Sequence, residues 1–320
     1  NCTMKNPKVS VIVICYNQRD TISRALDSVL AQEDCDYEVI IGDDASADGT
    51  REVCEEYARR YPGRVRLMPA APNKGVVDNY FDCFDAARGE YVADCAGDDY
   101  WLGTRRLAEM CGVLDSRSDV NTVYSDFEIL DLSTGKSRLA STDPEYSRWL
   151  GGDTEGRSLL ADILGHVGPL PYLLSASVYR KKALMEVYSK HRHMVRNRAF
   201  GCEDLPVMAA LARSGAAAYL PMPTMSYSVG GETITHNRSV ERQLGFYCAT
   251  LEASRVLGEF YGVGQAQMAE MFRAKSRYMA NMAFKSRRHG LVGKVADTVG
   301  RWHLSVGIKT KIYLLLGRIL

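Results

Sequence analysis

Short runs of apolar, mostly β-branched residues alternate with amphipathic segments through the first 130 residues of the chain. The run Val9–Cys15 (VSVIVIC) is almost continuously apolar, which is typical of a strand buried on both faces of a sheet. Further strands are expected at residues 37–42, 65–68, 90–95 and 121–130, with helices between them. Strands separated by helices indicate βαβ units, so the pattern predicts an α/β fold with a mainly parallel sheet flanked by helices.

The second half of the chain has a different pattern. Residues 131–170 lose the periodicity and gain Gly, Ser and Pro, and a long irregular stretch inside a compact domain usually carries function. Strands are then expected at 175–180 and 218–222, with helices at 181–190 and 205–214. From Val240 onward the sequence is helical in character. We therefore predict one α/β domain over residues 1–235 and a C-terminal helical extension over residues 236–320.

The cysteines and the apolar segments bear on the cellular compartment. Nine cysteines without a CxxC pair argue against a disulfide framework or a zinc site and favour a reducing compartment. The N-terminal residues NCTMKNPK do not resemble a signal peptide, and no run of about 18 apolar residues predicts a membrane-spanning helix. We expect a cytoplasmic protein.

Two of the predicted strands are followed by pairs of carboxylates. Asp43-Asp44 follows the second strand, and Asp98-Asp99 lies three residues past the fourth. Ligands of parallel sheets bind at the carboxyl ends of the strands, and adjacent carboxylates need a cation or a hydrogen-bonded ligand to stay charged. A divalent metal that holds phosphates is a common solution. The alternative is that these residues only form turns and helix caps, for which Asp is favoured.

Three motifs stand in order on these elements: VSVIVICYN, EVIIGDDASADGT and GEYVADCAGDD. In this the chain resembles the inverting family 2 glycosyltransferases, which have the Rossmann-like nucleotide-diphospho-sugar transferase fold called GT-A. The resemblance is closest over about residues 8–130, which would be the nucleotide-binding part. It continues more weakly over about residues 131–235, the acceptor part, through YRKKAL and the pair Glu203-Asp204.

The resemblance implies a role for each residue of the donor motifs. Tyr16 would lie against the nucleotide base, and Asp44 would accept a hydrogen bond from it. Asp98 would hold the ribose region, and Asp99 would bind Mn²⁺ or Mg²⁺ at the diphosphate. A metal ion there would act as a Lewis acid where negative charge develops on the leaving group.

The resemblance also implies a general base. The pair Glu203-Asp204 is similar to the family's ED motif, whose Asp takes the proton of the acceptor hydroxyl. The alternative is that the pair only opens the helix at 205–214, where acidic residues interact favourably with the helix dipole. Both readings are compatible, because a base at the start of a helix is also well positioned.

Some residues extend the family pattern and others depart from it. Tyr227 precedes a Gly- and Thr-rich segment that contains His236, and a neutral imidazole there is a candidate further metal ligand; a surface histidine is the alternative. Asp78-Asn79 stands where the family often has Arg-Asn, so a basic contact to the donor from that helix is in doubt. The Gln-x-x-Arg-Trp signature of processive synthases is missing, so we expect one sugar per binding event or a short alternating product.

The formal net charge of +1 hides a division of charge along the chain. Residues 271–320 hold 11 Lys or Arg and one acid, Asp297. Five apolar residues fall on one helical face there: Ile308, Ile312, Leu315, Leu316 and Ile319. A basic amphipathic helix is typical of a membrane-surface element, although a helix packed on the domain remains the alternative. No nucleic-acid-binding motif accompanies the charge, so we expect no nucleic-acid partner.

Taken together, the residues and the resemblance predict an inverting, metal-dependent glycosyltransferase of the hexosyl- or N-acetylhexosaminyltransferase class. Its donor would be a nucleoside-diphosphate sugar, with a UDP-sugar as the first candidate. Its acceptor would be a hydroxyl of a glycan or a lipid-linked sugar in polysaccharide synthesis, and an anionic membrane surface is a candidate partner of residues 271–320. Two alternatives stay open: a nucleotidyltransferase, and a non-catalytic, membrane-docked protein that binds nucleotide sugars.

Overall fold

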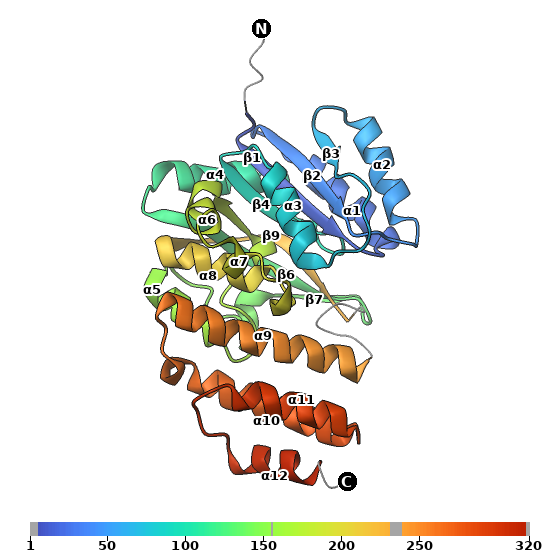
Figure 1. Cartoon of the computed structure of the whole chain (residues 1–320). Helices are drawn as coiled ribbons and strands as arrows, with labels where there is room; N and C mark the ends of the chain where they lie inside the picture. The colour runs from blue at the N-terminus through green and yellow to red at the C-terminus, as the bar shows by residue number, and fades with distance from the viewer. Residues whose placement is uncertain (1–5, 155, 231–238, 318–320) are drawn as a thin grey trace.

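A computed structural model of the chain describes residues 6–154, 156–230 and 239–317. Its strands form one sheet in the order β3-β2-β1-β4-β8-β6-β9-β5, with β7 paired to β6 (Figure 1). The strands are β1 Val9–Cys15, β2 Tyr37–Asp43, β3 Val65–Leu67, β4 Tyr91–Ala96, β5 Tyr100–Trp101, β6 Val120–Asp131, β7 Lys136–Leu139, β8 Ser177–Arg180 and β9 Ala216–Val229. Helices pack on this sheet, which confirms the α/β fold class.

The α-helices fall into two groups along the chain. Those of the first 230 residues are α1 Arg19–Leu30, α2 Thr50–Arg60, α3 Val76–Ala86, α4 Arg106–Ser116, α5 Gly156–Leu164, α6 Lys181–Tyr188, α7 Arg192–Val195 and α8 Asp204–Ser214. Those that follow are α9 Val240–Tyr261, α10 Ala269–Lys285, α11 His289–Gly300 and α12 Ile308–Leu316. Short 3₁₀ helices lie at Ala140–Thr142, Leu174–Ala176, Arg198–Phe200 and Gln265–Met268.

The first four strands form the parallel half of the sheet. β1 pairs in parallel with β2 on one side and with β4 on the other, and its apolar residues are almost completely buried. Because the chain moves from β1 outward to β3 and then returns to β4, the strand order reverses between β1 and β4. In an open α/β sheet this switch point leaves a crevice at the carboxyl ends of the strands, where ligands bind.

The other half of the sheet mixes directions and returns the chain to this crevice. β8 is antiparallel to both β4 and β6, whereas β9 runs parallel to β6. The last part of β9 pairs with β5, which directly follows Asp98-Asp99. The end of β9 therefore lies against the carboxylate pair, although the two segments are more than 120 residues apart in the sequence.

Two elements differ from the sequence-based expectation. β9 extends over Ala216–Val229 instead of ending near residue 222, because the strand continues through Pro221 and Pro223 with register shifts in its pairing with β6. Proline lacks the N–H that a ladder needs, and it therefore looks like a strand end in the sequence. Residues 131–170, expected to be irregular, contain β7 and α5, and α5 packs on α8.

The helices α9 to α12 form a layer below the sheet domain (Figure 1). α9 packs on α5 and α8, and α10 in turn packs on α9, α11 and α12. Phe272 of α10 stacks on Trp302 with ring centroids 4.9 Å apart, and Met271 and Met279 are buried beside it. None of the helices in the described ranges is both long and apolar enough to cross a bilayer.

Candidate active site

The loops after β1 and β2 are tied to each other. The backbone N–H of Asn17 donates to Ser46 Oγ at 2.9 Å, and Asn17 Oδ1 accepts the N–H of Ala47 at 2.9 Å. Asn17 and Ala45 both have positive φ angles (52° and 62°), a backbone strain that these contacts maintain. The pinned loop leaves the ring of Tyr16, which is 52% exposed, at the mouth of the crevice.

Asp44 holds the loop that precedes α3. Its two carboxylate oxygens accept the backbone N–H groups of Lys74 and Gly75 at 2.8 and 2.9 Å. Its buried neighbour Asp43 lies 3.7 Å from a guanidinium nitrogen of Arg51. The first Asp pair is therefore compensated by backbone donors and by an arginine, and it needs no metal ion. Each oxygen of Asp44 can still accept one more hydrogen bond, as the expected contact with a nucleotide base requires.

Asp98 and Asp99 lie at the switch point. A side chain at Gly97 would collide with Gln18 and Cys15, so the glycine allows this loop to approach β1 closely. Ser228 of β9 donates its N–H to Asp99 Oδ1 at 2.9 Å and its hydroxyl to the carbonyl of Asp98 at 2.8 Å. No Lys or Arg nitrogen in the described part of the chain lies within 4.0 Å of either carboxylate. Burial, together with the charge of Asp98, raises the pKa of Asp99 well above its usual range.

This pair fits a divalent cation. The charges of Arg24 and Arg106 act on the pair without forming an ion pair with it. Two adjacent carboxylates are costly in such a buried position, and a hard cation with oxygen ligands relieves that cost. No cluster of three Asp, Glu, His or Cys side chains that could hold a metal occurs among the described residues. The remaining ligands would therefore come from elsewhere, such as the diphosphate or water. His236, the expected further ligand, lies outside the described residues.

Glu203 and Asp204 lie at the N-terminus of α8. Asp204 is its first residue, and Asp204 Oδ1 accepts the N–H of Leu205 at 2.6 Å. Burial, followed by the charges of Asp204 and Asp94, raises the pKa of Glu203 to about 8. Burial also raises the pKa of Asp204. A carboxylate with a raised pKa is a stronger base than an ordinary aspartate, as proton abstraction from a hydroxyl requires.

Tyr227 of β9 connects the two groups of carboxylates. Burial raises the pKa of its hydroxyl, and the charges of Asp99, Asp98 and Asp204 and the nearby Tyr146 add to this effect. The charges of both carboxylate groups therefore act on the same tyrosine, and a shared site of the donor residues and the base stays a prediction from the sequence.

A buried ionisable layer beneath the site was missed at the sequence level. Asp94 of β4 is buried, and burial raises its pKa to about 8. Arg106 of α4 is also buried; it lies 4.3 Å from the Trp101 ring and donates to the carbonyls of Ser175 and Ser177 at 2.7 and 3.1 Å. Asp94 is the charged residue within the otherwise apolar strand sequence YVADCA, and it was the sequence feature from which this buried layer could have been predicted.

Asp78 has arginine partners from a distant segment. This buried carboxylate accepts from Arg196 Nε at 2.5 Å and also pairs with Arg198. The Arg198 side chain is 71% exposed and precedes Glu203 by five residues. A basic group therefore does stand at the start of α3, where the family often has Arg-Asn, but residues 196–198 supply it instead of the helix itself.

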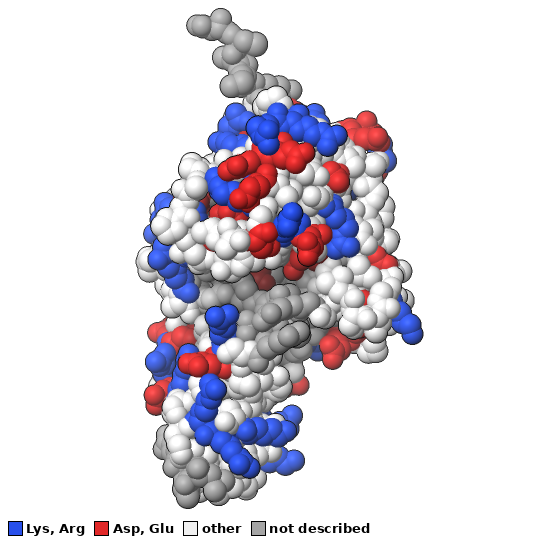
Figure 2. All heavy atoms as spheres, turned by 90° about the vertical axis from the view of Figure 1, so that its right-hand side faces the viewer, with Lys and Arg blue, Asp and Glu red and all other residues white. Residues whose placement is uncertain are grey.

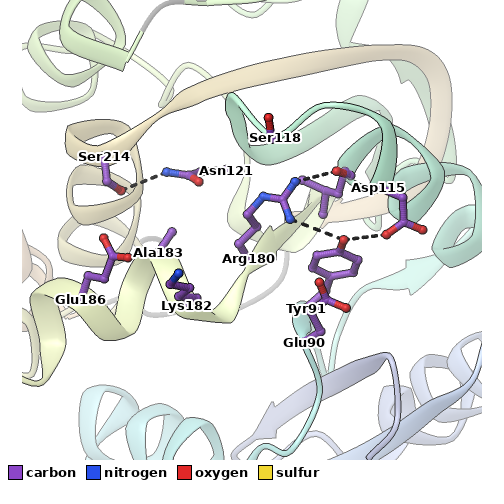
Figure 3. A pocket seen from close by; sticks show the side chains of 11 residues that line it. Glu90, Tyr91, Asp115, Ser118, Asn121, Arg180, Lys182, Ala183, Glu186 and Ser214 are labelled. Atoms are coloured by element: carbon purple, nitrogen blue, oxygen red, sulfur yellow. Dashed lines mark hydrogen bonds between the residues drawn. The ribbon is translucent and has the colours of Figure 1, made fainter.

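A separate cavity of about 470 Å³ lies at the opposite end of β4 (Figure 3). Arg180 crosses it and donates to the carbonyls of Val120, Leu114 and Arg117 at 2.8, 2.5 and 3.0 Å. Asp115, at its edge, accepts from the hydroxyl of Tyr91 at 2.7 Å. These groups are already satisfied by the protein, and the cavity lies away from the carboxyl ends of the parallel strands. It is therefore not the donor site.

Comparison with known proteins identifies relatives of the site-bearing region. Residues 10–155 match the family described as Glycosyl transferase family 2. A Nostoc protein described as an uncharacterized glycosyltransferase is 32% identical over 176 residues, which are 51% of this chain and 54% of that protein. The Escherichia coli protein named UDP-Glc:alpha-D-GlcNAc-diphosphoundecaprenol beta-1,3-glucosyltransferase WfgD is 28% identical over 123 residues, which are 38% of this chain and 47% of WfgD.

The whole fold has a solved counterpart. The mannosyltransferase PcManGT from Pyrobaculum calidifontis, solved in complex with GDP-Man and Mn²⁺, aligns with a TM-score of 0.55 at 15% identity. That alignment covers 99% of this chain and 81% of PcManGT. The likeness supports the GT-A-like fold, including the C-terminal helices. The chain spans between about a third and a half of the length of the curated relatives it matches.

Proposed function

We propose that the chain transfers a sugar from a nucleoside-diphosphate sugar to a hydroxyl of a glycan or lipid-linked acceptor in polysaccharide synthesis, because residues 10–155 match the family described as Glycosyl transferase family 2. One observation carries the proposal: the buried pair Asp98-Asp99, which has no ion pair within the described residues, lies at the switch point of the sheet, where Ser228 of β9 holds Asp99. A nucleotidyltransferase would share the sheet, but it would not need a second carboxylate group such as the pair at the start of α8.

Each donor residue has a definite task in this proposal. Tyr16 offers an exposed aromatic face for the nucleotide base, and Asp44 accepts a hydrogen bond from that base. Asp98 faces the ribose. Asp99 holds Mn²⁺ or Mg²⁺, which when bound would stabilise the negative charge of the leaving diphosphate.

Asp204 acts on the acceptor. Its carboxylate accepts the proton of the acceptor hydroxyl as that oxygen forms a bond to the anomeric carbon. The bond between this carbon and the diphosphate oxygen breaks on the opposite side, and its electron pair leaves with the diphosphate. A displacement with the attacking and leaving oxygens on opposite faces inverts the anomeric configuration. Burial and the charge of Asp204 raise the pKa of Glu203, so Glu203 favours the protonated form more than an ordinary glutamate does.

The donor class is tested by ligand-dependent stability. We propose a UDP-sugar, since the name of WfgD includes UDP-Glc, with GDP-mannose as the competing choice because PcManGT was solved with GDP-Man. A donor at 100 times its Kd should stabilise the protein by about 2.7 kcal/mol. The measurement is the melting temperature with Mn²⁺ and each of a panel of UDP-, GDP- and dTDP-sugars. If no donor raises the melting temperature with either Mn²⁺ or Mg²⁺, the proposed function is wrong.

We also propose that residues 236–320 are an extension that docks the transferase domain, residues 1–235, on an anionic membrane. In α12, Ile308 is 76% exposed and Leu315 is 62% exposed, and Ile312 and Leu316 are exposed on the same face. Lys309 and Lys311 flank this face. Figure 2 shows Lys and Arg side chains along the lower end of the molecule, where the C-terminal helices lie, with few acidic ones among them.

Replacing Ile312 and Leu315 together by Glu should reduce binding to vesicles of phosphatidylcholine with 30% phosphatidylglycerol by at least about tenfold. The expectation follows because burial of each such side chain is worth about 1.5–3 kcal/mol. Co-sedimentation with vesicles measures it. A matched control replaces Leu132 and Met222, which are exposed on the sheet domain, by Glu and should bind normally. Equal binding of the α12 variant and the native protein would refute the membrane proposal.

A further inference from the structure

Three aspartates of α3 fall on one face of the helix. Asp78, Asp82 and Asp85 follow one another at intervals of four and three residues, so their side chains lie in a row along the helix. Like charges at this spacing destabilise a helix, and the carboxylate of Asp78 is also buried. α3 itself contains no Lys or Arg. This face therefore needs cations from another part of the chain.

Arg196 pairs with all three of these carboxylates. Its Nε donates to Asp78 at 2.5 Å, and its terminal nitrogens donate to Asp82 at 2.7 Å and to Asp85 at 3.4 Å. The Arg196 side chain is only 16% exposed. A guanidinium presents its N–H groups in one rigid plane, whereas an ammonium is a point charge. Arginine is therefore suited to hold three carboxylates along two turns of one helix.

The same ion pairs extend to the loop that Asp44 holds. The ammonium of Lys74 lies 2.6 Å from Asp82, on the carboxylate oxygen that Arg196 does not use. The backbone N–H of Lys74 donates to Asp44 at 2.8 Å. Arg196 is therefore joined to the proposed donor residue Asp44 through only two residues, and each contact is a hydrogen bond or an ion pair.

The segment that follows Arg196 leads directly to the proposed base. A 3₁₀ helix at Arg198–Phe200 packs on α9, and its last side chain is buried. The chain then turns at Gly201, whose φ is 73°, just before α8. The side chain of Glu203, the N-cap of α8, accepts no hydrogen bond from the helix within the described ranges. The preceding segment, and not an N-cap side chain, therefore holds the end of α8 where Asp204 lies.

We propose that Arg196 is a positioning residue for the sugar transfer. It fixes the segment before Asp204 to α3, and it thereby sets the place of the base relative to a donor bound at Asp44. The inference rests on the proposed function. A misplacement of about 1 Å can lower a rate by about 10²-fold. Because Arg196 acts through the backbone that it holds, its loss should slow the reaction without weakening donor binding.

The test measures release of the nucleoside diphosphate with Mn²⁺ and with water as the acceptor. The donor is UDP-glucose, or the sugar nucleotide of the panel above that stabilises the native protein more. Arg196→Met should lower kcat at least about tenfold and leave the KM for the donor near its native value. Arg192→Met is the matched control, because this exposed arginine pairs with Asp85 alone, and its kcat should stay native. A native kcat in Arg196→Met would overturn the proposal.

A double variant separates positioning from stability. Arg196→Met combined with Asp85→Asn removes one charge of each sign. The two carboxylates that remain on this face of α3 keep Arg198 and Lys74 as partners. The double variant should therefore recover most of the native melting temperature but not the native kcat. Recovery of both would show a merely structural role and refute the proposal. If Arg196→Met alone does not fold, the kcat of the double variant decides.

Failure of this inference differs from failure of the proposed function. If the native protein releases no nucleoside diphosphate from any donor of the panel, the proposed function fails and the inference fails with it. If the native protein is active and the Arg196 variants keep its kcat, only the inference fails.

Discussion

Asp204→Asn should lower the rate of sugar transfer by about 10²–10⁴-fold and leave donor binding unchanged. An amide has nearly the same shape as the carboxylate and can still accept the N–H of Leu205, so α8 should still begin at residue 204. What it loses is the ability to take the proton of the acceptor hydroxyl. Release of the nucleoside diphosphate in the presence of acceptor measures the rate, and the donor-dependent melting temperature measures binding.

The neighbouring carboxylate provides the matched control. Glu203→Gln removes a carboxyl group next to Asp204 whose pKa burial raises, so it carries less charge at neutral pH than an ordinary glutamate. It should reduce transfer by less than about tenfold, because it is not the proton acceptor. In the native enzyme the raised pKa of Asp204 places the loss of activity on acidification at a higher pH than an ordinary aspartate would. Full activity of Asp204→Asn would assign the base to another residue.

Asp99→Asn should have two opposite effects: it should stabilise the metal-free protein and abolish metal-dependent donor binding. The folded-state pKa of Asp99 lies well above its unfolded value, so the charged form at neutral pH opposes folding. This destabilisation is absent at pH values below the pKa of Asp99 in the unfolded chain, and it develops as the pH rises above that pKa. Asparagine removes the buried charge and can still accept the N–H of Ser228.

Melting temperatures with EDTA, with Mn²⁺, and with Mn²⁺ and the donor measure both effects of Asp99→Asn. Asp126→Asn is a suitable comparison, since Asp126 is equally buried but its carboxylate accepts from Ser141 Oγ at 2.6 Å, away from the switch point. That variant should lose stability and keep the donor response. A donor response of native size in Asp99→Asn would show that Asp99 does not hold the metal.

The parallel half of the sheet could be predicted from the sequence because its strands are buried on both faces. Such strands appear as apolar runs, and the observed bounds of β1, β2 and β4 differ from the expected ones by one residue or less at each end. The long β9 could not be predicted, because its prolines interrupt the ladder. The return of β9 to Asp98-Asp99 depends on tertiary pairing, which a local pattern does not contain.

The candidate site, like the fold, could be predicted only where its residues belong to local sequence patterns. Motifs at the ends of strands or at the start of a helix identified six candidate residues, and the proposed roles of these residues stay predictions. They are Tyr16, Asp44, Asp98, Asp99, Glu203 and Asp204. Arg106 and Ser175 are 69 residues apart in the sequence, and Asp78 and Arg198 are 120 apart. Neither pair forms a motif, so only the packing of the helices on the sheet domain shows that they meet.

The central claim is that Asp98, Asp99 and Asp204 form the site of an inverting sugar transfer. The most direct measurement is proton NMR of the native protein with Mn²⁺ and its α-linked nucleotide sugar in the absence of acceptor, recorded before the released sugar mutarotates. Water should replace the acceptor hydroxyl, and we expect the β-anomer as the first product, with no release from Asp99→Asn. The α-anomer as the first product, or release that persists in Asp99→Asn, would contradict the claim.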